Sequence, residues 1–182
     1  MMAFKAAPSL AAGNCFILKP SEKTPFASLA LGKLIKLAGF PAGVFQVLSG
    51  DGSTGALLAS HLKIRKISFT GSGAVGKKVQ AAAANSNLKR VTLELGGKSP
   101  AVVFDDCNLN KTVKKTVDSI LNNTGQSCIA ISRIYVQEGL CVEFTRLYKQ
   151  EMERRGKLAG QPTEPATQFG PLVSLFYFEN FQ

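Results

Sequence analysis

The sequence predicts an α/β protein with a parallel sheet. Short apolar runs of strand length alternate with longer amphipathic runs of helix length. Gly, Pro, Ser and Asp, which favour turns, bound the short runs. Neighbouring parallel strands need a crossover connection, which is usually a helix. The β-α-β-α-β order of the runs therefore predicts parallel strands joined by right-handed crossovers.

Five apolar runs of strand length occur within residues 15–104. The predicted strands are CFIL (15–18), VFQVL (44–48), KISF (66–69), VTLEL (91–95) and AVVF (101–104). Two of the helices expected between them are STGALLASH (53–61) and AVGKKVQAAAAN (74–85), the first of which ends at the only histidine, His61.

The helix expected between the first two strands has the clearest start and stop signals. Thr24 is placed to cap it, and Pro25 suits the first helical position because no N–H donor is needed there. Gly39 and then Pro41 end it. Its expected apolar face consists of Leu29, Ala30, Leu34, Leu37 and Ala38.

The alternation of strand-length and helix-length runs changes after Gly96-Gly97. A helix is predicted at about 110–122, a strand at 132–137 and a charged amphipathic helix through about Arg155, and the stretch 156–174 is rich in turn formers. We therefore expect a boundary near residue 96, with one structural unit at 1–95 and another at 96–182.

Composition narrows the class of protein. The 182 residues are 45% hydrophobic, as in a soluble globular chain, and no run of about 18 apolar residues predicts a transmembrane helix. Pro8, Gly13 and Asn14 interrupt the apolar opening, so we expect no secretion signal. The four cysteines form no CxxC pair, so we expect no metal site and a reducing, cytoplasmic setting.

The formal charge of +10 raises nucleic-acid binding as an alternative, because Lys and Arg neutralise phosphates. The basic residues come in scattered pairs, at Lys77-Lys78, Lys89-Arg90, Lys114-Lys115 and Arg154-Arg155. None is interleaved with aromatic residues that would stack on bases. We expect solvated helix faces and no nucleic-acid partner.

Two glycine-bearing turns from strand to helix are candidate phosphate sites. SGDGSTG (49–55) and FTGSGAVG (69–76) would let the backbone approach a phosphate closely, and each following helix would offer unpaired N–H groups. Glycine also serves only to bend such turns, so either role fits each turn. Lys19 and Glu22 directly follow a strand, where side chains meet ligands or form a solvated salt bridge.

Glu94 and Cys128 are the candidates for catalysis. Burial within the strand 91–95 would raise the pKa of Glu94 toward that of a general base, whereas strand alternation favours a solvent-facing side chain. Cys128 follows Gly125-Gln126-Ser127, which indicates a loop whose N–H groups would lower the thiol pKa and stabilise an oxyanion. The alternative is an inert core cysteine.

Taken together, these stretches resemble the aldehyde dehydrogenase superfamily. The motifs, in order, are LKPSEKTP, AGFPAGVFQVLSG, FTGSGAVGK, LELGGKSP and NTGQSC, and the 34 positions between Glu94 and Cys128 suit that family. The resemblance covers about Ala3 to Ser174. It implies a partial dinucleotide-binding domain at 1–95, with a Rossmann-like sheet, and the start of an α/β catalytic domain at 96–182.

The resemblance implies oxidation of an aldehyde to a carboxylic acid, with hydride transfer to NAD, or NADP, through a cysteine thiohemiacetal and thioester. Cys128 would be the nucleophile and Glu94 the base. Lys19 and Glu22 would hold the adenosine ribose, with Glu22 favouring NAD, and Ser72 would contact the pyrophosphate. The other expected cofactor residues are Gly50 and Gly52 near the adenine, Phe69, Gly71 and Val75 in the second glycine turn, and Leu95 and Gly96 beside the nicotinamide.

Departures from the family pattern predict an internal fragment that lacks both ends. The family's oxyanion-hole asparagine belongs upstream of MMAFKAAPSL, Phe4 stands where tryptophan is common, and Gly73 replaces a usual threonine. The family's acidic-Ile-Phe-Gly-Pro motif is absent, and the tail departs from the family after GPLVS. We therefore expect a homo-oligomer for full-length members but not for this fragment, and a chain that is poorly soluble or inactive alone. A truncated, inactive remnant is the alternative function.

Overall fold

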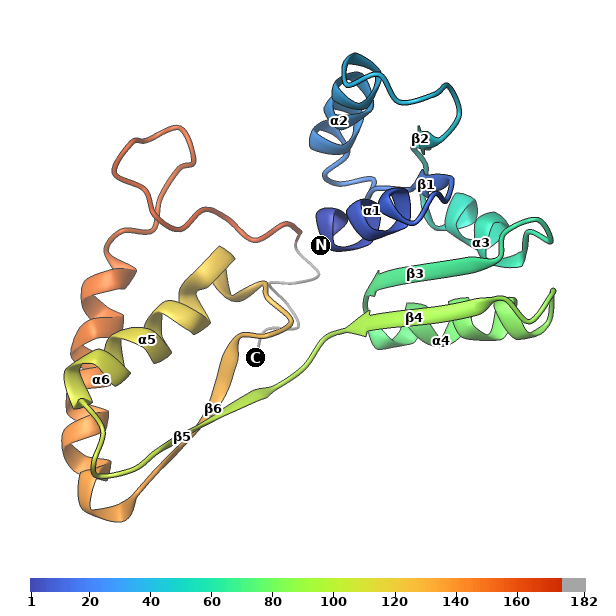
Figure 1. Ribbon diagram of the computed structural model, residues 1–182. Coiled ribbons are helices and arrows are strands. Elements are labelled where there is room, and N and C mark those ends of the chain that lie inside the picture. Colours follow the sequence, from blue (N-terminus) through green and yellow to red (C-terminus); the bar gives the residue numbers. More distant parts are fainter. Residues whose placement is uncertain (175–182) are drawn as a thin grey trace. The chain divides into compact units, whose positions relative to one another are not determined.

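The computed structural model describes residues 1–174 as helices and parallel strand pairs, which confirms the predicted α/β class (Figure 1). The predicted change in the tail after residue 174 lies outside the described residues. The chain divides into two compact units, Met1–Leu95 and Gly96–Gln182. Each unit is described by itself.

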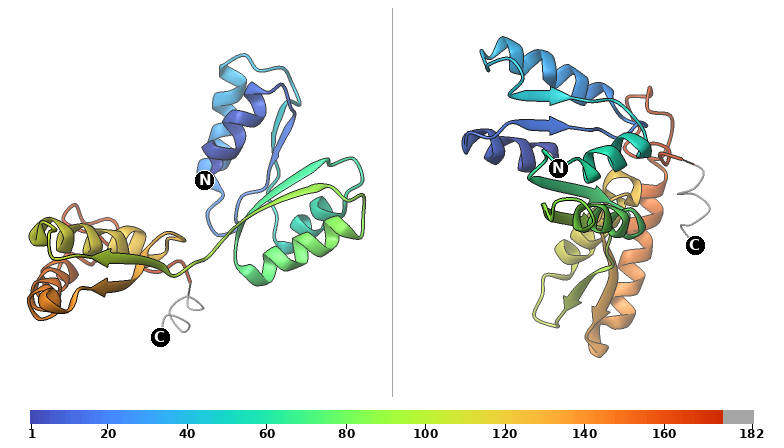
Figure 2. Two further views of the ribbon diagram at one scale, coloured as in Figure 1. Left: turned by 60° about the horizontal axis from the view of Figure 1, so that its bottom comes forward. Right: turned by 90° about the vertical axis from the view of Figure 1, so that its right-hand side faces the viewer.

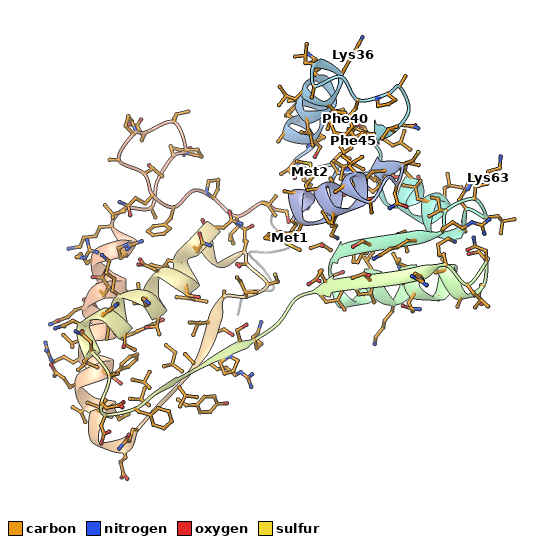
Figure 3. The ribbon with its side chains drawn as sticks, in the orientation of Figure 1. Met1, Met2, Lys36, Phe40, Phe45 and Lys63 are labelled. Carbon is orange, nitrogen blue, oxygen red and sulfur yellow. The ribbon has the colours of Figure 1, made fainter. Side chains whose placement is uncertain are left out.

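The first unit opens with a helix, a strand, a helix and a strand. These are α1 (Met2–Ala11), β1 (Phe16–Leu18), α2 (Phe26–Leu37) and β2 (Phe45–Val47). The two strands pair in parallel, with Phe16 opposite Phe45 and their rings stacked at a centroid distance of 5.6 Å. Figure 3 shows Phe45 on β2 and Phe40 in the connection between α2 and β2.

The second half of this unit has the same order of elements: a helix, a strand, a helix and a strand. It contains α3 (Gly52–Ser60), β3 (Lys66–Gly71), α4 (Gly73–Ala84) and β4 (Arg90–Leu95). β3 and β4 are parallel, in a register that runs from Lys66 opposite Arg90 to Gly71 opposite Leu95. α4 packs on this pair with small residues, of which Gly76 and Ala83 are buried, so the helix comes close to the strands.

The second unit is a parallel strand pair with two helices on one face (Figure 2). Its elements are β5 (Ser99–Val103), α5 (Leu109–Leu121), the 3₁₀ turn η1 (Asn122–Gly125), β6 (Ile131–Val136), the 3₁₀ turn η2 (Glu138–Leu140) and α6 (Cys141–Gly156). Val103, Val113, Val117 and Phe144 form its core. The core joins β5 to both helices, so α5 is held firmly where it leads into η1.

One helix was not predicted, and one expectation about local structure was wrong. The opening, for which no element was expected, forms the helix α1, which contains Pro8. Alanine and leucine are good helix formers, and Ala6 and Ala7 precede Pro8 while Leu10 and Ala11 follow it within α1, so helix propensity opposes the effect of the missing N–H donor. Thr24 does not cap α2: its backbone N–H bonds to the Ser21 carbonyl in a separate turn, and Pro25 is the N-cap residue.

The predicted apolar face of α2 is exposed in the described unit. The side chain of Leu37 is 83% accessible, and Leu29 and Leu34 are also exposed. Two lysines of this unit, Lys36 on α2 and Lys63 in the turn between α3 and β3, belong to separate segments, in keeping with scattered positive charge (Figure 3). Among residues 1–174 no helix is long and apolar enough to cross a membrane.

Candidate active site

The carboxyl ends of β3 and β4 bring one candidate residue, Glu94, beside Thr70. The register sets these two residues opposite each other, and paired residues of parallel strands point to the same face of the sheet. Lys5 of α1 donates a hydrogen bond from Nζ to Thr70 Oγ1 at 2.6 Å. Glu94 is exposed, as strand alternation favoured, and a lysine from the distant N-terminal helix lies on its side of the sheet.

Lys5 is a site residue that the sequence analysis missed. Partial burial lowers the pKa of its ammonium group, and the negative charge of Glu94 acts in the opposite direction to raise that pKa. The charge of Glu94 therefore acts on the Lys5 ammonium group, whose hydrogen bond goes to Thr70. In the sequence, Lys5 is a single basic residue within an apolar opening. It could have been recognised as a site residue only if the helix α1 had been predicted first.

The opposite face of the β3–β4 pair carries the other predicted residues, against α4. The Phe69 ring lies over Gly71, where an added Cβ would come within 2.5 Å of the ring's Cζ atom. The ring therefore packs closely over Gly71, and a larger residue at this position would displace the Phe69 side chain. Leu95 pairs with Gly71 across the two strands and shares this face.

Ser72 and Val75 form the first turn of α4. Ser72 is the N-cap residue, and its Oγ accepts a hydrogen bond from the Val75 backbone N–H at 3.3 Å. The first N–H groups of a helix lack partners within the helix, and no acidic residue occupies this first turn. A neutral cap and a positive dipole end leave this helix start suited to a phosphate oxygen.

The N-terminus of α3 is different because Asp51 already occupies it. The Asp51 carboxylate accepts from the Ser53 backbone N–H at 2.9 Å and from the Ser53 hydroxyl at 2.6 Å. These bonds, the side-chain one first, lower the pKa of Asp51. A carboxylate at the helix start repels phosphate, so of the two glycine turns the one before α4 is the better anion site. Asp51 was not singled out, although an Asp before a Gly-Ser-Thr helix start is a capping signal.

Lys19 joins the ends of β1 and β2. Its Nζ donates to the carbonyls of Pro20 at 2.9 Å and Gly50 at 2.8 Å, and lies 3.9 Å from Glu22 Oε2. The stem of this lysine lies near Gly55 of α3, where an added Cβ would be 3.6 Å from Lys19 Cε, an ordinary contact. Three predicted ribose and adenine residues thus meet at one point, and Gly52 begins α3, where an added Cβ would meet nothing within 4 Å.

Cys128 follows a left-handed turn in the second unit. Asn123, Thr124 and Gly125 have φ angles of 52°, 56° and 74°. This conformation suits glycine and is tolerated by asparagine, but it strains a β-branched threonine. Strained backbone persists only where surrounding contacts hold it, and such residues gather at functional sites.

Hydrogen bonds hold this turn in place. The Gln126 side chain donates to the Asn123 carbonyl at 3.1 Å, and the Asn123 side chain donates to the Gln126 carbonyl at 3.0 Å. Two further bonds reach a segment far along the chain, from Thr124 Oγ1 to the Gly170 carbonyl at 3.2 Å and from the Val173 N–H to Gln126 Oε1 at 2.9 Å. Gln126 and Thr124 are further site residues that spacing alone did not identify.

The thiol of Cys128 is exposed, so within the described chain it is not a buried core cysteine. Cys15 and Cys141 are also exposed, and exposure alone therefore does not distinguish Cys128. The packing of its loop does distinguish it. Gly97 lies so close to this loop that a Cβ added to the glycine would be 3.1 Å from the Cys128 carbonyl oxygen. Of the remaining predicted residues, Gly96 is exposed at the start of this second unit, whereas Glu94 belongs to the first.

A protein-family model and several solved structures match this chain. The whole chain, residues 1–182, matches the model of the aldehyde dehydrogenase family. It is 49% identical over 174 residues to human retinal dehydrogenase 2, covering 95% of this chain and 33% of that protein. The chain thus spans about a third of the length of the curated relatives it matches.

Solved structures also match the fold of this chain. The gamma-glutamyl-gamma-aminobutyraldehyde dehydrogenase from Burkholderia cenocepacia matches with a TM-score of 0.93 at 42% identity, over 98% of this chain and 36% of that one. The protein PnpE, solved in complex with nicotinamide adenine dinucleotide, matches with a TM-score of 0.91 at 40% identity, over the same shares of the two chains.

Proposed function

Because the chain belongs to the aldehyde dehydrogenase family, we propose that the protein it represents oxidises an aldehyde to a carboxylic acid with NAD. The observation that carries the proposal is the exposed Cys128, set in a hydrogen-bonded left-handed turn within a chain of this family. In the same proposal, residues 1–95 bind the cofactor and residues 96–182 carry the nucleophile.

The chemistry requires covalent capture of the substrate by the chain. The Cys128 sulfur attacks the aldehyde carbon, and the carbonyl oxygen becomes the alkoxide of a thiohemiacetal. Bound NAD would supply the hydride acceptor for this step. The thiohemiacetal carbon gives up its hydride as the alkoxide collapses to a thioester on Cys128. An aldehyde alone lacks the second heteroatom that drives hydride out, so the thiol supplies it.

Glu94 completes the turnover as a base. It takes a proton from the water that attacks the Cys128 thioester, the carbon–sulfur bond breaks, and the carboxylic acid leaves with the thiolate restored. Its exposed position supports access to water, and Lys5 provides a positive charge on the same face of the sheet. Aldehyde and water are thus converted to an acid while one hydride and one proton are released.

In the same proposal, side chains of the first unit hold the dinucleotide. Lys19 and Glu22, which lie 3.9 Å apart, hold a ribose, and the Glu22 carboxylate favours NAD because it repels a 2′-phosphate. The neutral Ser72 cap favours the pyrophosphate at α4, whereas the Asp51 carboxylate disfavours it at α3. The PnpE complex with nicotinamide adenine dinucleotide supports the same choice of cofactor.

The test is NADH formation from an aldehyde and NAD, followed by absorbance. Acetaldehyde serves as a short substrate, and retinal tests the preference suggested by the name of the human relative. Cys128→Ser should abolish turnover, whereas Cys141→Ser, a substitution at another exposed thiol, should leave it unchanged. Equal turnover by both variants would refute the role of Cys128. No NADH from any aldehyde would refute the proposed activity for this chain and favour the alternative, a truncated and inactive remnant.

A further inference from the structure

Gly76 lies where α4 crosses the end of β4, and its missing side chain makes room for Leu95. The glycine is buried. A Cβ added to it would lie 2.9 Å from Leu95 Cδ2 and 3.6 Å from Leu95 Cδ1, with Leu93 Cδ1 in ordinary contact at 3.7 Å. The end of the Leu95 side chain therefore fills the notch that the glycine leaves in α4.

A methyl group at residue 76 would move Leu95 and leave the backbone in place. The atom too close to the added carbon is the far end of a flexible side chain, and the backbone bond from the Gly76 N–H to the Ser72 carbonyl, 2.9 Å, needs no change. Leu95 is 36% exposed, so its side chain has open space to move into. That space is at the carboxyl end of β4, because Leu95 is the last residue of this strand.

We propose that Gly76 is a positioning residue for the nicotinamide side of the site, because it lets Leu95 withdraw onto α4 and leaves room for the ring. The inference rests on the proposed function, in which residues 1–95 bind the cofactor, and on the place beside the nicotinamide that the family resemblance implies for Leu95. The residue acts through Leu95 and touches neither the cofactor nor the substrate.

Gly76→Ala tests this by separating stability from binding. Alanine is a better helix former than glycine, so the midpoint of thermal unfolding should stay the same or rise. The displaced Leu95 should weaken NADH binding about tenfold or more, the effect of one misplaced methylene in an apolar pocket. ADP-ribose, which lacks the nicotinamide, should bind with unchanged affinity. Both affinities can be measured by calorimetry on the complete chain.

A second substitution tests the contact itself. Leu95→Val removes both Cδ atoms, so Gly76→Ala should no longer affect NADH affinity in the Leu95→Val background. Gly156→Ala is the matched control, because an added Cβ at that helical glycine of α6 meets nothing within 4 Å. It should change neither affinity.

The outcomes separate the two claims. If the unchanged chain binds no NADH, the proposed cofactor site fails and the inference fails with it. If the unchanged chain binds NADH but Gly76→Ala binds it equally well, only the inference is overturned. Equal losses of NADH and ADP-ribose affinity, or a loss that persists in the Leu95→Val background, would also overturn it, because the damage would then not act through Leu95.

Discussion

Val117→Ala should destabilise the second unit by about 2 kcal/mol. Val117 is 0% exposed in the core shared by β5, α5 and α6. The change deletes two methyl groups, worth roughly 0.8 kcal/mol each by transfer, and the cavity left behind adds to that loss. The higher helix propensity of alanine returns a few tenths of a kcal/mol.

Urea unfolding followed by circular dichroism measures this loss. With a slope of about 2 kcal/mol per molar, a loss of about 2 kcal/mol lowers the midpoint by about 1 M at unchanged slope. Val142→Ala makes the same chemical change on α6, at a side chain that is 85% exposed, and should cost less than about 0.5 kcal/mol. Equal effects of the two substitutions would refute the described core, and with it the support of α5 for the Cys128 turn.

Three further predictions concern a cap and two charged groups. Asn108→Ala removes the oxygen that accepts from the Lys111 N–H at 3.0 Å and should cost about 1 kcal/mol in urea unfolding, whereas Asn108→Asp should not. The hydrogen bond from Arg154 is the main cause of the lowered pKa of Glu151. This glutamate therefore stabilises the fold above pH 4.5, and the stabilisation is lost as the pH falls through its folded pKa. Glu151→Gln should flatten the acid side of a curve of unfolding free energy against pH. Burial lowers the pKa of Lys5, so stability should rise with pH between its folded pKa and 10.5, and Lys5→Met should remove that rise.

Much of the fold was predictable because local signals agreed with the tertiary structure. The runs at 66–69 and 91–95 became β3 and β4, and 74–85 became α4, each within two residues of the expected bounds. Their apolar residues are bounded by turn formers, so burial and chain geometry favour the same ends. The helix α1 escaped prediction because Pro8 argues against a helix interior, and only the flanking alanines oppose it.

The site was less predictable because its geometry depends on distant residues. Nothing local brings Lys5 to Thr70, which are 65 positions apart. Thr124 adopts a left-handed conformation against its own preference because contacts to the segment around Gly170 hold it there. Motifs indicated Cys128 and Glu94 as candidates, but only the folded chain shows which neighbours tie down the loop before Cys128 and which charge accompanies Glu94.

The acyl state of Cys128 during turnover tests the central claim most directly. The protein would be mixed with aldehyde and NAD, quenched rapidly in acid and digested, and its cysteine peptides weighed by mass spectrometry. The account predicts an acyl adduct on the Cys128 peptide that requires NAD and is absent from Cys15 and Cys141, which are also exposed. No adduct on Cys128, or equal adducts on all three exposed thiols, would contradict it.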